Sequence, residues 1–321
     1  MQSKRIAVLL SAYNGEQYIK KQIESILNQE NINLINIIVR NDGSTDETLC
    51  VLKELQKNNY NLEILDEENI GLVASFLRLL EYSYAQGYDY YAFSDQDDYW
   101  LPEKLSVAIK HIENCKEPCM YAACSLIADN NLRTNGNKTQ TKIRDISFYN
   151  SAIQNICPGH NQVLNHQMAG MIVQKKYSSE IYSQDLWITQ IASVTGKIFF
   201  DNSPHTIYRQ HNSNQLSFGR NKIGWVKSHI KRLQKNEGKK MALQLSYFCK
   251  CYKDFLTIEQ KEEINSFFES QTSFVKRMTY ILSTQLYRQR KYETFLFKCI
   301  YLMGGYNIGQ ENIHHKNGLI K

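Results

Sequence analysis

The fold is decided by the stretch Ile6-Ala-Val-Leu-Leu-Ser-Ala-Tyr-Asn-Gly15, in which five apolar residues run directly into a polar turn. A short apolar run that ends at a turn is typical of a buried β-strand. In the residues that follow, Ile19, Ile23 and Ile26 recur at the spacing of an amphipathic helix. The stretch therefore predicts a strand followed by a helix that packs on it.

The same alternation of strand and helix repeats as far as residue 93. Apolar runs predict strands at residues 35–39, 62–65 and 90–93, and between them lie two helical stripes, Leu49/Leu52/Leu55 and Leu72/Phe76/Leu79/Leu80. Strands separated by helices of this length predict a mostly parallel α/β sheet. Since ligands of such sheets bind beyond the carboxyl ends of the strands, we expect the polar loops 11–14, 41–45 and 94–98 to converge there.

The second half of the chain has a weaker pattern. Residues 128–165 are rich in Asn, Thr and Lys and predict a loop. We expect this loop to lie on the side where a second substrate, the acceptor of a transferred group, would bind. After this loop we expect strands at 168–173, 197–200 and 206–208, a helix at 185–194, and only helices from Ile223 onward.

Charge divides the chain near residue 219. Residues 1–219 hold 19 Lys and Arg against 24 Asp and Glu, whereas residues 220–321 hold 19 against 8. This asymmetry predicts a catalytic domain at 1–219 and a basic helical region at 220–321.

Composition narrows the protein class. No run reaches the 18 apolar residues of a membrane-spanning helix, and the N-terminus lacks the pattern of a signal peptide, so we expect a cytoplasmic protein. The eight cysteines lack the paired spacing of a zinc site and predict free thiols. No signature of a nucleic-acid-binding motif is present, and we expect no nucleic-acid partner.

Three carboxylates stand close together in Phe93-Ser-Asp-Gln-Asp-Asp-Tyr-Trp100, after an apolar run. Like charges so concentrated favour neutralisation by a cation, and all-oxygen ligation suits Mg²⁺ or Mn²⁺. The alternative interpretation is a solvated turn in which Asp97 or Asp98 caps a helix that has Pro102 in its first turn.

The loops after the first two strands could hold a nucleotide. Asp42 could accept a hydrogen bond from a base N–H, and residues 11–15 offer backbone groups at close approach. Neither loop has the glycine pattern of a P-loop or a Rossmann dinucleotide site.

A series of motifs, in order along residues 5–217, resembles the inverting glycosyltransferases of family 2, which have the GT-A fold. The motifs are Leu10-Ser-Ala-Tyr-Asn-Gly-Glu-Gln-Tyr-Ile19 with Ser25-Ile-Leu-Asn-Gln29, Val39-Arg-Asn-Asp-Gly-Ser-Thr-Asp-Glu-Thr48, Asn69-Ile-Gly-Leu72, Phe93-Ser-Asp-Gln-Asp-Asp-Tyr-Trp-Leu-Pro-Glu-Lys-Leu105, Gln184-Asp-Leu-Trp187 and Tyr208-Arg-Gln-His-Asn-Ser-Asn214. The motifs that begin at Phe93 and Tyr208 are most similar to the rhamnosyltransferase-like enzymes of bacterial polysaccharide and O-antigen assembly.

The resemblance implies a role for each matching residue. Asp42 would hold the uracil or thymine of a nucleotide-diphosphate sugar, and Asp95 and Asp97 would form the D-x-D motif for ribose and a Mn²⁺ or Mg²⁺ ion. His211 would approach the metal, and Asp185 would be the catalytic base. Donor binding would further involve Ser11, Tyr13, Glu16 and Arg209. The resemblance assigns no role to Asp98 or to residues 157–161.

The predicted reaction is transfer of a sugar, with inversion, from dTDP-rhamnose or a UDP-hexose to a hydroxyl of a glycan or a lipid-linked glycan. Two alternatives remain, a sugar nucleotidyltransferase and a non-catalytic glycan-binding or scaffold module of the same fold. The nucleotidyltransferase should carry a basic, glycine-rich phosphate loop near the first strand, and residues 11–15 are not one.

Seven Lys and Arg residues between 222 and 240 accompany Trp225 and an apolar stripe at Ile223, Val226, Ile230 and Leu233. Such a helix suits peripheral contact with the anionic inner face of the cytoplasmic membrane. The alternatives are a basic solvated face over an ordinary packed stripe, or a homodimer interface.

Overall fold

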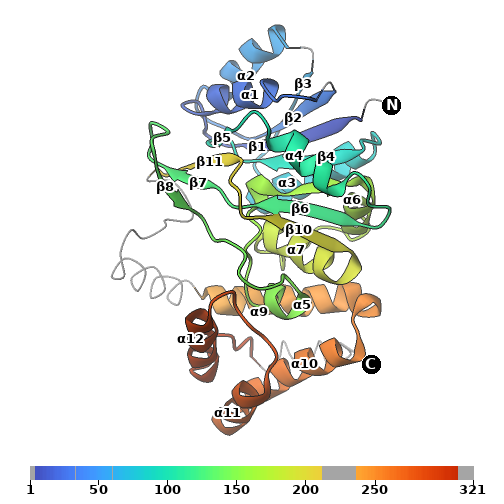
Figure 1. Cartoon of the computed structure of the whole chain (residues 1–321), viewed down its shortest axis with the longest axis vertical. Helices are drawn as coiled ribbons and strands as arrows, with labels where there is room; N and C mark the ends of the chain where they lie inside the picture. The colour runs from blue at the N-terminus through green and yellow to red at the C-terminus, as the bar shows by residue number, and fades with distance from the viewer. Residues whose placement is uncertain (1–3, 33, 60, 212–235, 310–321) are drawn as a thin grey trace. The chain divides into compact units, whose positions relative to one another are not determined.

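The computed structural model describes residues 4–32, 34–59, 61–211 and 236–309 (Figure 1). The chain forms two compact units: residues 1–141, 156–177 and 196–214 make the first, and residues 142–155, 178–195 and 215–321 make the second. The second unit takes two segments from before residue 219, so the units are interleaved along the sequence. The functional division at residue 219 stays a prediction.

The first unit is built on a sheet with the strand order β10-β6-β9-β4-β1-β2-β3. Neighbouring strands are parallel, except that β9 runs antiparallel to both β4 and β6. The strands are β1 (Ile6–Ala12), β2 (Ile35–Asp42), β3 (Leu62–Glu67), β4 (Tyr90–Ser94), β6 (Cys119–Ala123), β9 (Val163–Asn165) and β10 (Lys197–Asp201).

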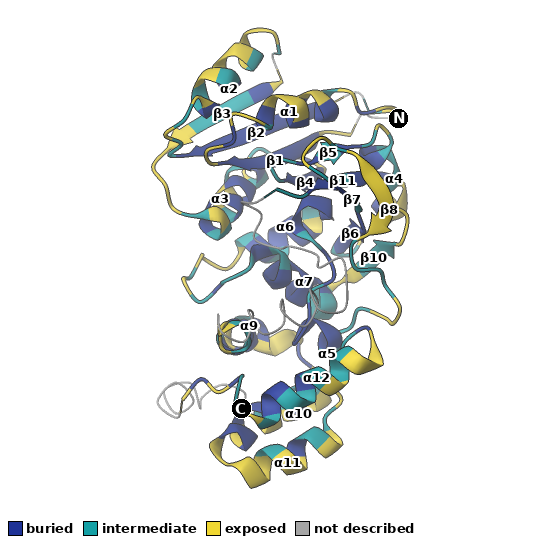
Figure 2. Cartoon of the chain, turned by 90° about the vertical axis from the view of Figure 1, so that its left-hand side faces the viewer, coloured by how far each residue is buried: buried dark blue, intermediate teal, exposed yellow. Residues whose placement is uncertain are grey.

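Helices cover both faces of this sheet (Figures 1 and 2). Alternate residues of β1, such as Val8 and Leu10, form one core cluster with Ile23 and Ile109. Burial on both faces explains why β1 is a continuous apolar run instead of an alternating one. The helices are α1 (Ile19–Leu27), α2 (Thr48–Lys57) and α4 (Lys104–Ile112) on the face of this cluster, and α3 (Leu72–Tyr84) and α6 (His166–Val173) on the other.

A smaller sheet has the order β5-β11-β7-β8. Its strands are β5 (Tyr99–Trp100), β11 (Thr206–Arg209), β7 (Leu126–Ala128) and β8 (Thr134–Lys138). Because β5 follows directly on the carboxylate-rich residues 95–98 and pairs with β11, this sheet brings residues near Arg209 to that loop.

The second unit is helical in its described residues. Its α-helices are α5 (Phe148–Ser151), α7 (Gln184–Thr195), α9 (Glu237–Tyr252), α10 (Ile258–Glu269), α11 (Phe274–Ser283) and α12 (Lys291–Leu302). Its short 3₁₀ helices are η2 (Lys253–Phe255) and η3 (Ser270–Thr272). Another 3₁₀ helix, η1 (Gly159–Asn161), belongs to the first unit. Trp187 of α7 stacks on Tyr247 of α9, with ring centroids 5.5 Å apart. No described helix is both long and apolar enough to cross a membrane.

The predicted strands at 6–10, 35–39, 62–65, 90–93, 197–200 and 206–208 are confirmed, as are the helices around residues 19–27, 49–55, 72–80 and 185–194. The apolar stripe at Ile223 lies outside the described residues.

Two predictions are wrong. Residues 168–173 belong to the helix α6 instead of a strand, because a fully buried apolar run has no period that separates the two states. Residues 128–165 are not simply a loop, since their last three residues form β9 inside the main sheet. Three residues are too few to show a strand pattern.

Asn165 joins β9 to its neighbours. Its Oδ1 accepts hydrogen bonds from the backbone N–H groups of Cys119 (2.9 Å) and Met168 (3.0 Å), and its Nδ2 donates to the Glu117 carbonyl (2.8 Å). One amide thus caps α6 and ties it to β6.

We predict that Asn165→Ala lowers the free energy of unfolding by about 2 kcal/mol, because it leaves buried backbone groups without partners and removes a helix cap. Urea denaturation followed by circular dichroism measures this. Asn137→Ala on the exposed strand β8 is the matched control and should change stability by less than about 0.5 kcal/mol. Equal stabilities of the two variants would contradict the role of Asn165.

Candidate active site

The loops that follow β1 and β2 interlock at the carboxyl edge of the main sheet. Asn14 adopts a left-handed backbone conformation, with φ at 49°, and its Oδ1 accepts a hydrogen bond from the Thr45 N–H at 2.8 Å. The Gly15 N–H donates to Thr48 Oγ1 at 2.7 Å. Glu16 Oε2 accepts a hydrogen bond from the Glu47 N–H at 2.8 Å. Glu16, which is predicted to bind the sugar donor, therefore lies at the start of α2. The two loops are therefore one rigid structure.

Gln96 ties the carboxylate-rich loop to the same structure. Its amide accepts a hydrogen bond from the Tyr13 N–H and donates one to the Tyr13 carbonyl, both at 2.9 Å. A Cβ atom on Gly15 would lie 2.2 Å from Gln96 Oε1, so only glycine allows this approach. The Tyr13 ring stays half-exposed, whereas the Ser11 hydroxyl is buried against Ser75 at 2.6 Å.

Asp42 lies buried at the end of β2. Its two carboxylate oxygens accept hydrogen bonds from the backbone N–H groups of Ile70 (2.8 Å) and Gly71 (3.0 Å), and Oδ1 also contacts the Arg40 guanidinium. Arg40 in turn donates to Glu67 at 3.0 Å. These contacts hold the Asp42 carboxylate in one orientation.

The loop between β4 and β5 gathers charged groups from distant segments. Ligand atoms of Asp95, Asp98 and His160 lie within 4.8 Å of one another. His160 Nδ1 is 3.4 Å from Asp95 Oδ2 and 3.6 Å from Asp98 Oδ2, and its Nε2 is 2.9 Å from the Ser125 hydroxyl. The alternative interpretation of this loop is wrong: α4 begins at Lys104, and neither Asp97 nor Asp98 caps it.

Burial and neighbouring charges shift the pKa values of Asp98, His160 and Lys104. It raises the pKa of the Asp98 carboxyl to about 7, against the opposing effect of the His160 charge. Burial alone would lower the pKa of the His160 imidazole, but the charges of Asp98 and Asp95 outweigh it and raise that pKa. Behind them Lys104 is buried over the Trp100 ring and donates to the His160 carbonyl at 2.6 Å. Burial lowers the pKa of the Lys104 ammonium well below its usual value, although Asp98 and Asp95 oppose the shift.

Asp97 forms a second pair, with His211. Their Oδ2 and Nε2 atoms lie 2.6 Å apart, and the His211 ring stacks on Tyr18 with centroids 4.8 Å apart. Burial raises the pKa of the Asp97 carboxyl, and the Asp95 charge adds to this shift. Arg209 Nε donates a hydrogen bond to the Asp97 carbonyl at 2.8 Å. Arg209, which is predicted to bind the sugar donor, thus also stabilises the loop at residues 95–98.

These donors fit a hard divalent cation. They comprise three carboxylates and two imidazoles, and Asp98 Oδ2 has no hydrogen-bond partner among the described residues. Of the residues predicted to bind metal, the structure pairs Asp97 with His211 and groups Asp95 with Asp98 and His160 instead.

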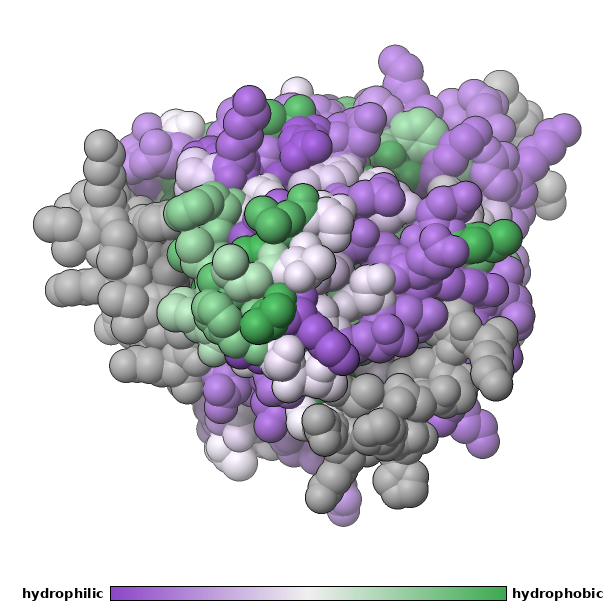
Figure 3. Space-filling model, turned by 90° about the horizontal axis from the view of Figure 1, so that it is seen from below, coloured by the Kyte–Doolittle hydropathy of each residue, from purple (hydrophilic) through white to green (hydrophobic). Residues whose placement is uncertain are grey.

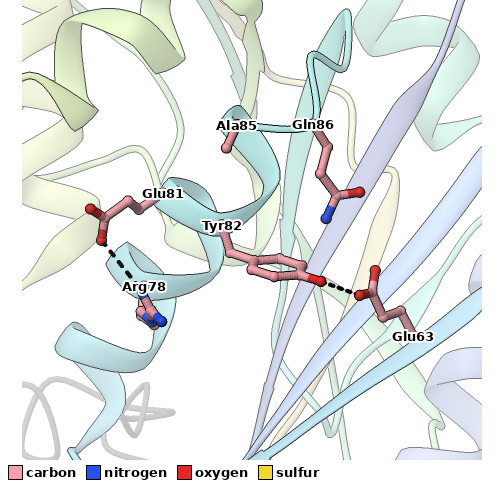
Figure 4. Close-up of a pocket in the computed structure, with 6 residues that line it drawn as sticks. All are labelled: Glu63, Arg78, Glu81, Tyr82, Ala85 and Gln86. Atoms are coloured by element: carbon pink, nitrogen blue, oxygen red, sulfur yellow. Dashed lines mark hydrogen bonds and ion pairs between the residues drawn. The ribbon is translucent and has the colours of Figure 1, made fainter.

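A separate pocket on α3 and β3 contains none of the predicted residues. Glu63, Arg78, Glu81, Tyr82, Ala85 and Gln86 line it. The Tyr82 hydroxyl donates to Glu63 and Arg78 pairs with Glu81, as Figure 4 shows. The carboxyl edge of the sheet is therefore the candidate active site.

Comparison with known proteins identifies the chain's family. The family model described as "Glycosyl transferase family 2" matches residues 7–176, which is more than half of the chain. The chain belongs to glycosyl transferase family 2. This membership makes it a glycosyltransferase and confirms the family predicted from the sequence motifs.

Individual relatives and solved structures are also similar to this family 2 glycosyltransferase. The dTDP-rhamnosyl transferase RfbG of Shigella flexneri is 28% identical over 216 residues, which are 64% of this chain and 73% of that protein. Among solved structures, S. aureus TarS 1–349 in complex with UDP-GlcNAc superposes with a TM-score of 0.60 at 14% identity, covering 98% of this chain and 84% of that one. A mannosyltransferase of Pyrobaculum calidifontis in complex with GDP-Man and Mn²⁺ has a TM-score of 0.54 at 14% identity over 94% and 85% of the two chains. These structures show the predicted GT-A fold.

Asp185 lies in the first turn of α7, in the second unit of the glycosyltransferase. Its Oδ1 accepts a hydrogen bond from the Leu186 N–H at 2.8 Å and contacts the Ser183 hydroxyl. Burial raises the pKa of the neighbouring Tyr182 phenol, and the Asp185 charge adds to this effect. Its role as catalytic base stays a prediction.

Sequence reasoning missed three residues of the carboxylate loop's surroundings: His160, Lys104 and Gln96. His160 stands in a stretch with no regular pattern, and Lys104 looks like an ordinary residue at the start of a helix. Gln96 and Lys104 both lie in the family motif that runs from Phe93 to Leu105, but the resemblance assigned neither residue a role.

We predict that Gln96→Ala and Gly15→Ala each destabilise the protein by about 1 kcal/mol, because each removes the two hydrogen bonds between Gln96 and Tyr13. The Gln96→Ala background lacks the side-chain atoms that the methyl group of Gly15→Ala would meet first, so the double variant should be no less stable than Gln96→Ala alone. Urea denaturation of the four proteins measures this coupling. Additive losses would show that Gly15 acts independently of Gln96.

Proposed function

We propose that this protein transfers a sugar from a nucleotide-diphosphate donor to a hydroxyl of a glycan or a lipid-linked glycan, with inversion, in the synthesis of a cell-surface polysaccharide. The observation that carries the proposal is the cluster of Asp95, Asp97 and Asp98 with two histidines at the carboxyl edge of a parallel sheet, in a chain of glycosyl transferase family 2. The match to the family 2 model favours this function over the two alternatives.

On the donor side, we propose that Asp42 holds the base and that Ser11, Tyr13, Glu16 and Arg209 shape the surrounding pocket. The rigid hold on the Asp42 carboxylate supports its role, because a fixed acceptor orients a planar base without a cost in side-chain entropy. Asp42 could accept from the N3–H of either uracil or thymine, so the base does not select between the donors.

Asp95 and Asp97, with His211, would hold Mn²⁺ or Mg²⁺. The Asp95 side chain is 33% exposed and that of Asp97 is 17% exposed, whereas that of Asp98 is fully buried. Accessible carboxylates suit an ion that must also meet the donor, and the ion would stabilise negative charge on the departing diphosphate. We propose that Asp98 and His160 hold the Asp95 side chain in position.

Inversion by a single displacement needs a base for the acceptor hydroxyl and no covalent nucleophile. We propose Asp185 as that base. The Ser183 hydroxyl and the Leu186 N–H both contact its Oδ1, which supports the role because these contacts fix one edge of the carboxylate.

A screen of nucleotide sugars for metal-dependent binding and hydrolysis tests the proposed function. We expect binding of dTDP-L-rhamnose, with UDP-glucose and UDP-galactose as the next candidates, because RfbG is a dTDP-rhamnosyl transferase. Binding should be detected by saturation-transfer NMR and should require Mn²⁺ or Mg²⁺. Exclusive binding of a GDP- or CMP-sugar would overturn the donor and the role of Asp42.

In the same screen Asp97→Asn should abolish the metal-dependent binding of the donor, because it removes a charged ligand of the ion. Asp254→Asn, in the exposed 3₁₀ helix η2 of the second unit, is the matched control and should bind like the wild type. Unchanged metal dependence in Asp97→Asn would exclude Asp97 as a ligand.

The base is tested by Asp185→Asn, which keeps the size of the side chain but cannot take up the proton. We expect kcat to fall by about 10²-fold or more while donor affinity is kept. Asp254→Asn, which alters an exposed aspartate of the same unit, is again the control and should retain full activity. Sugar transfer at the normal rate by Asp185→Asn would mean that another residue is the base, and a product with retained anomeric configuration would refute single displacement.

A further inference from the structure

Glutamine side chains are buried inside the helical second unit, although hydrophobic side chains gather in a patch on the surface of the protein (Figure 3). Gln244 of α9 and Gln190 of α7 are 0% exposed, and Gln289, which precedes α12, is 4% exposed. A buried amide lowers stability unless it is hydrogen-bonded, because it has lost its contacts with water. The hydrogen-bond partners of each glutamine therefore indicate which part of the chain depends on it.

Gln244 holds the segment that leads into α7. Its Oε1 accepts hydrogen bonds from the backbone N–H groups of Tyr182 and Ser183, both at 3.1 Å, and its Nε2 donates to Gln190 Oε1 at 3.1 Å. Residues 181–183 belong to no helix or strand, so regular secondary structure does not hold them. A side chain of α9 therefore fixes the backbone at the start of α7.

Aromatic packing fixes Gln244 itself. Tyr247 and Phe248, three and four residues further along α9, lie on the same face of the helix as Gln244. Trp187 of α7 contacts both rings, with its ring centroid 5.5 Å from that of Tyr247 and 6.0 Å from that of Phe248. The face of α9 that carries Gln244 therefore packs directly on α7.

Ser183 connects the held segment to Asp185. The Ser183 carbonyl accepts a hydrogen bond from the Trp187 N–H at 3.0 Å, and its hydroxyl contacts Asp185 Oδ1. Asp185 is half-buried, so one of its edges can be fixed by the protein while the side chain keeps access to solvent. A shift of the Ser183 backbone would move the hydroxyl that orients this carboxylate.

We propose that Gln244 is a positioning residue for sugar transfer. It fixes the backbone of Tyr182 and Ser183, and through the Ser183 hydroxyl it orients the Asp185 carboxylate that takes up the proton of the acceptor hydroxyl. The inference rests on the proposed function, because it takes Asp185 as the base. Proton transfer is sensitive to small displacements of the base, which gives this hold a consequence for the rate. Gln244 lies beyond residues 7–176, which match the family model.

The variant Gln244→Met tests the proposal, because methionine is similar in length but carries only a weak hydrogen-bond acceptor. The assay is hydrolysis of the donor identified in the screen, expected to be dTDP-L-rhamnose, with Mn²⁺ and with water in place of the acceptor. We expect kcat to fall about tenfold while the affinity for the donor is kept. Gln244→Asn keeps the site polar but is one methylene too short to reach both N–H groups, and it should show the same loss.

Hydrogen exchange followed by mass spectrometry gives a readout that does not depend on activity. The backbone amides of Tyr182 and Ser183 should exchange faster in Gln244→Met than in the wild type, because they lose their acceptor. Unchanged exchange at these amides would overturn the proposal.

Gln289→Met is the matched control. Gln289 Oε1 likewise accepts hydrogen bonds from two backbone N–H groups of the second unit, those of Ile143 at 2.8 Å and Arg144 at 2.7 Å. Its loss should lower stability in urea as much as the loss of Gln244 does, but kcat should stay at the wild-type value. Equal kcat in Gln244→Met and Gln289→Met would overturn the proposal, because the role of Gln244 would then be structural only.

A cycle with Asp185→Asn shows through which residue Gln244 acts. In the Asp185→Asn background, Gln244→Met should lower kcat no further, because no base is left to orient. Losses that multiply would place the effect of Gln244 elsewhere and overturn the proposal. Wild-type hydrolysis by Asp185→Asn would refute the base of the proposed function and this inference with it. Slow hydrolysis by Asp185→Asn together with wild-type kcat in Gln244→Met would refute this inference alone.

Discussion

The buried carboxylate of Asp98 is the constraint on which the candidate site depends. A carboxylate without solvent access is unstable as an anion unless partners compensate it, and here burial raises its pKa to about 7. The partners come from three other segments of the first unit: the His160 imidazole, the Lys104 ammonium and the Arg209 backbone N–H. Folding of the loop at residues 95–98 therefore requires α4, η1 and β11 to be in place.

Hydrogen bonds also link the loops that follow the first four strands of the sequence. Gln96 contacts Tyr13, Asn14 contacts Thr45, and the backbone N–H of Ile70 contacts Asp42, so the loops after β1, β2, β3 and β4 form one connected structure. Asp95 and Asp97 are left at the accessible edge of this structure. Carboxylates held in this way are suited to binding a cation, because little reorganisation is needed when the ion arrives.

The second unit differs from the first in its interior packing and in its charge. Its interior is made of aromatic stacking, as between Trp187 and Tyr247, and its charge is strongly positive, whereas the first unit concentrates carboxylates at one edge. The carboxylates at the edge of the main sheet and the excess of basic residues in the C-terminal part of the sequence lie in different compact units.

The sequence by itself determined β1 to β4, the helices between them and the cluster of carboxylates after β4. Each of these features has a local signal: an apolar run, a helical period or adjacent acidic residues. Only the tertiary structure decided that residues 163–165 enter the main sheet, that residues 168–173 are helical, and that His160 and Lys104 meet Asp98. These features depend on contacts between segments far apart in the chain, where burial, hydrogen bonding and charge compensation outweigh any local preference of the residues.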